Sequence, residues 1–177
     1  MAQVDLISNQ SKVTAQAAAE ISGRGISGRA EFIEYDIEGY KYVKVSVKLS
    51  GDTSVLAPGK HACHIHEKAM TCEDEASDTF MCTGGHFDPG PNGNTNPDVN
   101  HSYHAGDLPN IIVDEEGNGQ MEAITNRFSL SPGPASLLNS PEGTSIMVHL
   151  KEDPYTPSEE KGHSGGPRLA AGNIIVA

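Results

Sequence analysis

Residues 40–49, YKYVKVSVKL, alternate between polar and apolar side chains and give the clearest indication of the fold. The apolar side chains fall at every second position, at Val43, Val45, Val47 and Leu49. A period of two places them on one face of an extended strand and the residues between them on the other. The stretch therefore predicts an antiparallel strand with one face in a core and the other in water.

Further segments have the pattern of short strands, and tight turns separate them. The segments are, approximately, residues 13–22, 29–37, 60–67, 108–114, 119–125, 143–150 and 169–176. Gly23-Arg24-Gly25 and Gly117-Asn118-Gly119 are typical turn sequences between them. No segment carries a sustained helical stripe of apolar residues. Short strands joined by tight turns indicate an all-β sandwich or closed barrel.

Two connections are too long to be simple hairpins. Residues 68–107 and 151–168, with approximate limits, are polar and rich in Gly, Pro, Asn and Asp. Long loops on a compact domain commonly carry function, so we expect both to be functional loops. The length of 177 residues fits one domain, and we expect residues 1–177 to form a single unit.

Charge and hydropathy argue against two classes of partner. The chain carries 24 acidic and 12 basic residues, which gives a net charge of -12. A nucleic-acid-binding protein needs a basic face, so we expect no nucleic acid as a partner. No apolar run approaches the roughly 20 residues of a membrane span, so we expect no membrane anchor. The first residues do not have the pattern of a signal peptide, which leaves the compartment open.

The cysteines are Cys63, Cys72 and Cys82, an odd number that fits no complete disulfide framework. Cys72 and Cys82 share one loop segment, where they can pair with each other. Cys63 lies in a strand pattern and is predicted to be a small buried apolar residue.

Six of the eight histidines lie between His61 and His104. His64-Ile65-His66 falls in a strand pattern, and residues two apart on a strand point to the same face. Both imidazoles can therefore reach one metal ion from a rigid strand. A single pair of this kind is weak evidence, because exposed histidine pairs also arise by chance.

Other candidate ligands lie in the loops and in a later strand, at His86, His101, His104, Asp107 and His149. A barrel can bring the last of these beside the strand pair. Three imidazoles and a carboxylate suit a closed tetrahedral zinc site, whereas four imidazoles in an open arrangement suit copper. So many candidates at strand and loop positions favour a metal centre over ordinary loop histidines.

With these positions in view, the chain resembles the copper–zinc superoxide dismutase family. The matching runs, in chain order, are GKHACHIHE (59–67), GGHFDP (84–89), HAGDLPN (104–110), GTSIMVHLKED (143–153) and GGPRLAAGNI (165–174). Several separate motifs in one order are far more specific than any one motif. The resemblance implies an eight-stranded antiparallel Greek-key barrel or sandwich, with a metal loop at about 68–107 and an electrostatic loop at about 151–168.

The resemblance also implies roles for individual residues. The copper ligands would be His64, His66, His86 and His149. His86 would bridge copper to zinc, since two cations make loss of both ring protons feasible, and His104 and Asp107 would be further zinc ligands. Asp153 would orient ligands of both metals. Arg168 would attract and dock an anion beside the copper.

The chain departs from the family pattern at two places. The remaining zinc histidine usually lies eight residues after the bridging one, where this chain has Asn94. We expect His101 to take that role, with water or Asn94 as the alternative. The family's disulfide between the metal loop and the barrel is expected to be missing, because its barrel position is Ala171. Cys72 resembles the loop partner that is left over, and Cys82 is the candidate replacement.

The resemblance implies an oxidoreductase that disproportionates superoxide to dioxygen and hydrogen peroxide at a copper centre with a structural zinc. A non-catalytic dismutase-like metal-binding module is the alternative, and a zinc-only domain is disfavoured by the four-histidine set. Retention of every copper candidate and of Arg168 favours the enzyme. The HAGDLPN run resembles bacterial members of the family, which favours a periplasmic or extracellular location over the cytoplasm. Superoxide is the expected partner, and a homodimer is left open.

Overall fold

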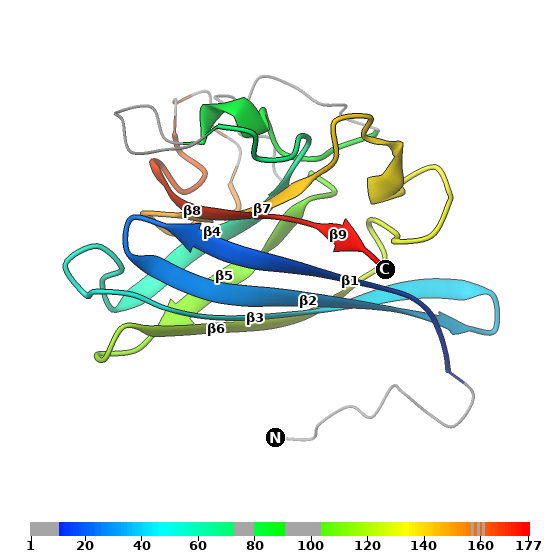
Figure 1. Cartoon of the computed structure of the whole chain (residues 1–177), viewed down its shortest axis with the longest axis horizontal. Coiled ribbons are helices and arrows are strands. Elements are labelled where there is room, and N and C mark those ends of the chain that lie inside the picture. The colour runs from blue at the N-terminus through cyan, green and yellow to red at the C-terminus, as the bar shows by residue number, and fades with distance from the viewer. Residues whose placement is uncertain (1–10, 73–79, 91–103, 157, 159, 161) are drawn as a thin grey trace.

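The computed structural model describes residues 11–72, 80–90, 104–156, 158, 160 and 162–177. These residues form strands and loops with only two short 3-10 turns, η1 (Met81–Thr83) and η2 (Leu137–Asn139). The arrangement can be followed in Figure 1. The strands are β1 (Lys12–Gly23), β2 (Ile26–Ile37), β3 (Tyr40–Ser50), β4 (Gly59–His66), β5 (Asp107–Val113), β6 (Asn118–Thr125), β7 (Ser145–His149), β8 (Arg168–Asn173) and β9 (Ile175–Val176). Neither turn in the described part of the chain has the length and apolar character that crossing a bilayer requires.

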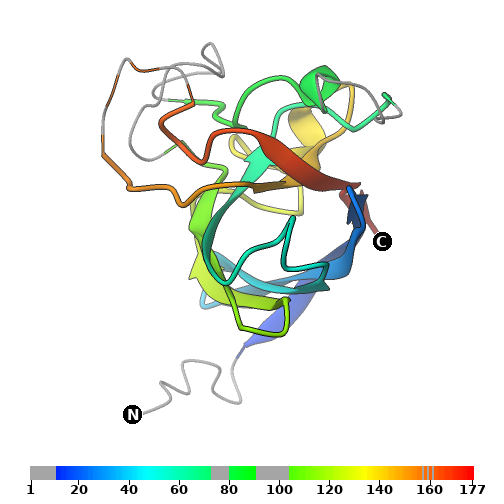
Figure 2. The ribbon, with the colours of Figure 1, turned by 90° about the vertical axis from the view of Figure 1, so that its left-hand side faces the viewer.

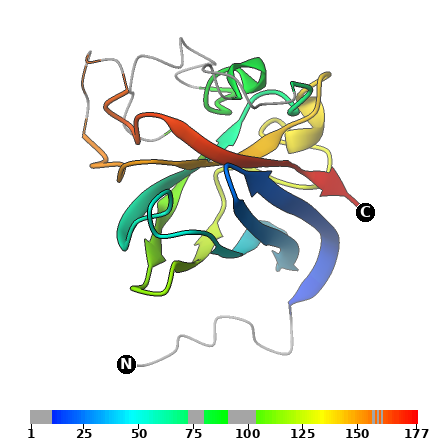
Figure 3. The same cartoon turned by 60° about the vertical axis from the view of Figure 1, so that its left-hand side comes forward.

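Eight of the strands close into a barrel. They are hydrogen-bonded in the order β2-β3-β6-β5-β4-β7-β8-β1, and β1 pairs back with β2. All of these pairings are antiparallel. β3 pairs with β6, and β4 pairs with β7, although these strands are not consecutive in the sequence, which is typical of a Greek key. Figure 2 and Figure 3 show the strands curving around a common interior. The predicted all-β antiparallel barrel is confirmed.

The alternating stretch at residues 40–49 lies in β3. Val43, Val45 and Val47 are at most 1% exposed, whereas Lys48 on the other face is exposed. The valines belong to one buried cluster with Phe32 of β2 and residues of the other strands. Full burial of a side chain of this size contributes about 1.5–3 kcal/mol relative to leaving it in water. The pattern therefore has the consequence that we predicted.

The segment predicted as one strand over residues 169–176 consists of two strands. β8 ends at Asn173 and β9 begins at Ile175, because Ile174 leaves the ladder between them. Ile174 is 7% exposed, and its N–H donates to the Thr144 carbonyl at 2.9 Å. β8 pairs with β7, whereas β9 pairs with β1.

β4 differs from β3 because it is covered on both faces. Every residue from His61 to His66 is buried. Cys63 and Ile65 belong to the barrel core. The described parts of the loops after β4 and β7 lie on one side of the barrel, over this strand (Figures 1 and 2), and Phe87 and Lys151 make main-chain bonds to it. Polar side chains in such a strand must have partners, which makes β4 the first place to look for a site.

Candidate metal centre

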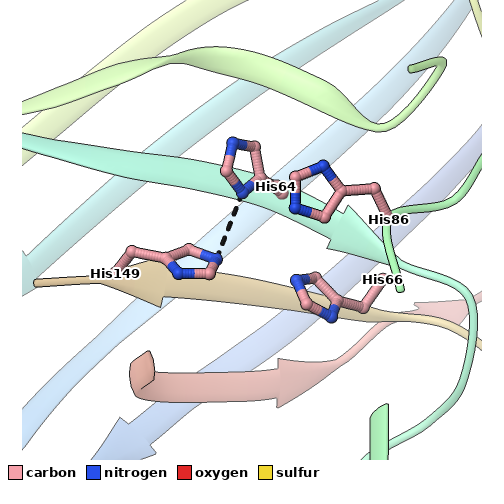
Figure 4. A group of neighbouring side chains, drawn as sticks. All are labelled: His64, His66, His86 and His149. Carbon is pink, nitrogen blue, oxygen red and sulfur yellow. Dashed lines mark hydrogen bonds between the residues drawn. The ribbon is translucent and has the colours of Figure 1, made fainter. Parts of the chain in front are cut away.

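Four buried histidines from three parts of the chain meet beside β4 (Figure 4). His64 and His66 come from β4, His149 ends β7, and His86 lies in the loop between β4 and β5. One ring nitrogen from each lies within 4.8 Å of the others. Because β4 pairs directly with β7, the fold brings together histidines that are far apart in sequence.

Three of these rings place their outer nitrogen against an oxygen that can only accept a hydrogen bond. The pairs are His64 Nε2 with Asp153 Oδ2 at 2.8 Å, His66 Nδ1 with the Gly84 carbonyl at 3.1 Å, and His149 Nδ1 with the Gly166 carbonyl at 3.0 Å. Each outer nitrogen must therefore carry the proton and donate it. When the ring is neutral, its inward nitrogen then carries a lone pair.

These lone pairs converge. His64 Nδ1 and His149 Nε2 approach to 3.1 Å, along the dashed line in Figure 4. His66 Nε2 is buried and has no hydrogen-bond partner among the described residues. Buried nitrogen lone pairs that face one another are unfavourable unless a proton or a metal cation lies between them. The donor set therefore fits a metal ion, and four imidazoles suit copper.

Burial favours the uncharged form of His66, His86 and His149. The pKa of His86 is lowered to about 4, first by burial and next by the nearby His64, although the Asp107 carboxylate raises it. Burial also lowers the pKa of His66 and of His149 well below the usual value, and the positive charge of Arg168 adds to the effect at His66. Neutral imidazole is the form that binds metals, so the site is ready to take up a cation at neutral pH.

His86 also belongs to a second group of potential ligands, with His104 and Asp107. His86 Nδ1 lies 2.8 Å from Asp107 Oδ1, and His104 Nδ1 lies 3.6 Å from Asp107 Oδ2. Burial raises the pKa of the Asp107 carboxyl, but hydrogen bonds from His104 and His86 outweigh it and hold the pKa below its usual range. Two imidazoles and a carboxylate suit zinc, which takes four ligands. The expected fourth ligand, His101, and its alternative, Asn94, lie outside the described residues.

Asp153 orients His64 and is itself held from several sides. Its Oδ2 accepts from His64 Nε2 at 2.8 Å and from Ser164 Oγ at 2.6 Å, and its Oδ1 accepts from the Tyr155 N–H at 2.8 Å. Asn110 makes a reciprocal pair with the main chain of Asp153, at 3.0 and 2.9 Å. Burial raises the pKa of Asp153, but the hydrogen bonds, chiefly from His64, leave it below the usual value.

Arg168, the first residue of β8, lies next to the four histidines. The register of β7 and β8 pairs it with His149. Its guanidinium donates to the Phe80 carbonyl at 2.6 Å, to the Gly84 carbonyl at 2.7 Å and to Thr83 Oγ1 at 3.1 Å. The residue is only 8% exposed, so a fixed positive charge stands at the edge of the site.

The loop that holds Arg168 is attached to the barrel by packing. Phe80 is 3% exposed and packs against Met147 of β7 and Ala171 of β8. Ala171 is the barrel position at which we expected the family's cross-link to be missing. Cys72 and Cys82 instead form a disulfide within the loop.

Sequence reasoning missed four residues that bond to the predicted site residues, namely Phe80, Asn110, Arg127 and Ser164. Phe80, Asn110 and Arg127 bond to residues at least 20 positions away in the sequence, whereas Ser164 lies 11 positions from Asp153 in the same loop. Asn110 closes the HAGDLPN run, so its place in a matching motif is the one sequence signal among the four. Nothing in the sequence around Arg127 connects it with residues 104–107.

Comparisons with known proteins point to one protein family. The family model described as copper/zinc superoxide dismutase (SODC) matches residues 26–174. The Cu-Zn superoxide dismutase of Deinococcus radiodurans is 39% identical over 130 residues, which cover 70% of this chain and 65% of that protein. Cu-Zn superoxide dismutase 2 of Aquifex aeolicus is 33% identical over 152 residues, which cover 84% of this chain and 79% of that protein.

Two further relatives extend the comparison. The extracellular Cu-Zn superoxide dismutase of Caenorhabditis elegans is 35% identical over 133 residues, which cover 72% of this chain and 55% of that protein. The matched region thus spans less than two thirds of the Deinococcus and Caenorhabditis proteins. The crystal structure of the clock protein EA4 has a TM-score of 0.66 at 26% identity, covering 92% of this chain and 95% of that one. The family match over most of the sequence shows that the chain belongs to the copper/zinc superoxide dismutase family.

Proposed function

We propose that the protein is a superoxide dismutase whose copper ion is held by His64, His66, His86 and His149. The observation that carries the proposal is the convergence of lone-pair nitrogens from buried histidines beside Arg168. Family membership implies copper and zinc as the cofactors. His86, His104 and Asp107 would hold the zinc, with His86 shared between the two ions.

The chain itself would bind and orient the reactants. When bound, copper supplies reversible one-electron chemistry and zinc supplies a fixed positive charge. Arg168 offers a permanent positive charge and planar N–H donors to the superoxide anion. Its contacts with the carbonyls of Phe80 and Gly84 hold the guanidinium in place before the substrate arrives. A buried site strengthens this attraction, because fewer water molecules screen it.

His86 is suited to handle a proton in the same reaction. Its Nδ1 faces Asp107, which leaves Nε2 for the four-histidine group. We assign to Nε2 the uptake of a proton in one half of the reaction and its release to the reduced oxygen in the other. The net reaction consumes two superoxide ions and two protons, and it yields one dioxygen and one hydrogen peroxide.

We also infer a periplasmic or extracellular location. Two observations support it: the disulfide between Cys72 and Cys82, and the relative from Caenorhabditis elegans that is named extracellular. Disulfides persist mainly in oxidising compartments.

The proposed function is tested by loading the protein with copper and zinc, quantifying both metals and measuring superoxide consumption. We expect rapid consumption by the wild-type protein. His149→Gln should lower copper occupancy and activity together. His163→Gln is the matched control, because His163 lies outside both ligand groups and bonds to Thr156 at 3.0 Å. Full copper occupancy without superoxide consumption would refute the enzyme and support a non-catalytic metal-binding module.

A further inference from the structure

Arg127, which follows β6, donates into the turn that carries two of the proposed zinc ligands. Its Nη2 donates to the His104 carbonyl and, at 3.1 Å, to the Asp107 carbonyl. Its own N–H donates to Thr125 Oγ1 at 3.1 Å, which fixes the chain where β6 ends. A guanidinium stays protonated in proteins, so both bonds to the turn are charge-assisted.

The turn also has bonds of its own, and the His104 carbonyl accepts from the Asp107 N–H as well as from Arg127, because a carbonyl oxygen has two lone pairs. The His104 N–H donates to Asp107 Oδ2 at 2.9 Å, and the Asp107 N–H donates to the His104 carbonyl at 3.1 Å. Gly106 lets the turn approach β4 closely, because a Cβ atom there would lie 2.4 Å from the Ile65 carbonyl oxygen. The turn is therefore held against β4 at Gly106 and is bonded to the segment after β6 through Arg127.

The role of Arg127 differs from that of the ligands. A guanidinium is a cation with no acceptor, so Arg127 does not bind a metal ion. It bonds to the main-chain carbonyls of His104 and Asp107, and through the main chain it affects the positions of their side chains. Of the copper candidates, only His86 is shared with the zinc group. Loss of Arg127 should therefore affect zinc before copper.

We propose that Arg127 is a positioning residue that holds His104 and Asp107 in the geometry that zinc requires, and that it acts selectively on the zinc half of the centre. This inference rests on the zinc site of the proposed function. Groups that orient metal ligands from outside the coordination sphere typically change metal affinity by about 10–100-fold when they are removed.

The test compares three variants of the full chain. Arg127→Met keeps much of the side-chain volume and removes both donors, whereas Arg127→Lys keeps the charge but loses the planar donor geometry. Arg29→Met removes the same charge from an exposed position on β2 and is the control. Zinc affinity is measured by competition with a chromophoric chelator, and copper affinity is measured in the same way. The absorption bands of Co²⁺ bound in place of zinc report the ligand geometry.

We expect Arg127→Met to weaken zinc binding by about 10–100-fold and to change the Co²⁺ spectrum, with copper affinity changed by less than about twofold. Arg127→Lys should recover part of the loss, and Arg29→Met should match the wild type. An unchanged zinc affinity in Arg127→Met overturns the inference. An equal loss of zinc and copper also overturns it, because Arg127 would then support the fold in general. A wild-type protein that binds no zinc would overturn the proposed zinc site, and the inference with it.

Discussion

Glu34 shows how single residues carry buried charge in this barrel away from the metal centre. Its side chain is inaccessible to solvent and accepts hydrogen bonds from Thr14 Oγ1 at 2.7 Å, Ser131 Oγ at 2.5 Å and the Leu130 N–H at 2.7 Å. Burial raises the pKa of the Glu34 carboxyl, but these bonds, led by Ser131 and Thr14, hold it below the usual value. The carboxylate thus joins β1 and β2 to the segment after β6.

We expect Glu34→Gln to lower the free energy of unfolding at neutral pH by about 1–3 kcal/mol. The NH₂ group of the amide would face the N–H and O–H donors that bond to the carboxylate, and would leave buried donors without an acceptor. The folded-state pKa of Glu34 lies below 4.5, so the carboxylate stabilises the fold above about pH 4.5. This contribution is lost as the pH falls through the folded-state pKa. Urea denaturation of the metal-free protein should show a difference between wild type and Glu34→Gln that shrinks from about pH 5 to about pH 3.

The exposed Glu38, in the turn between β2 and β3, provides the control for this prediction. Glu38→Gln should leave the unfolding free energy nearly unchanged over the same range. A Glu34→Gln difference that stays constant down to pH 3 would contradict the role assigned to the carboxylate.

Among the elements, the loop between β4 and β5 depends on its contacts with the barrel to keep its position. The disulfide between Cys72 and Cys82 lies within the loop, so it cannot fix the loop to β7 or β8. The Phe80 side chain packs against both strands, and its carbonyl accepts from Arg168. Asn173 of β8 and Ser145 of β7 also bond to the main chain of the loop, at Met70 and Lys68. Phe80 therefore links the packing of the loop to the position of Arg168, the residue proposed to attract the substrate.

Phe80→Ala should lower the free energy of unfolding by about 3–5 kcal/mol, which is typical of a buried aromatic residue. It should also lower the rate of superoxide consumption at equal copper content, because the Arg168 contact moves with the loop. Thermal or urea denaturation and rate measurements on metal-loaded protein check both effects. Leu138→Ala is the control, since Leu138 is 51% exposed. An unchanged rate in Phe80→Ala would show that Arg168 is held without Phe80.

Over the whole molecule, the net charge of -12 opposes the approach of an anionic substrate. Arg168 is buried at the site, and Lys151 is exposed in the loop after β7, with its side chain close to Gly166. A local positive field can raise association rates even on a molecule of the opposite net charge. The balance between the two fields depends on where the charges lie, and not on their sum.

If the local field governs association, the rate of superoxide consumption should fall as ionic strength rises. Lys151→Gln should lower the rate at low salt and flatten the salt dependence. One lysine should change the rate by about severalfold, since the whole field in electrostatic steering raises association rates by about 10–10³-fold. Lys48→Gln, on an exposed position of β3, is the control. Measurements across about 0.01–0.2 M salt span the range over which screening becomes effective. A rate that rises with salt would show that the net charge dominates.

The strands could be predicted because their information is local. The alternation in β3 is a property of neighbouring residues, and so is the pairing of His64 with His66 on one face of β4. The split of the last strand at Ile174 could not be predicted in this way. It depends on a bond to Thr144, which is 30 positions earlier in the sequence and adjacent only in the barrel.

The family and the candidate metal ligands could be predicted from the sequence, because short motifs in a constant order indicate them. The tautomers of the histidines, the contacts of Arg168 with Phe80 and the bonds from Arg127 to residues 104 and 107 could not. These features arise from strand register and barrel closure, which set distances between segments that the order of residues does not contain. Residue types thus specify which chemistry is available, and long-range packing specifies which atoms face one another to carry it out.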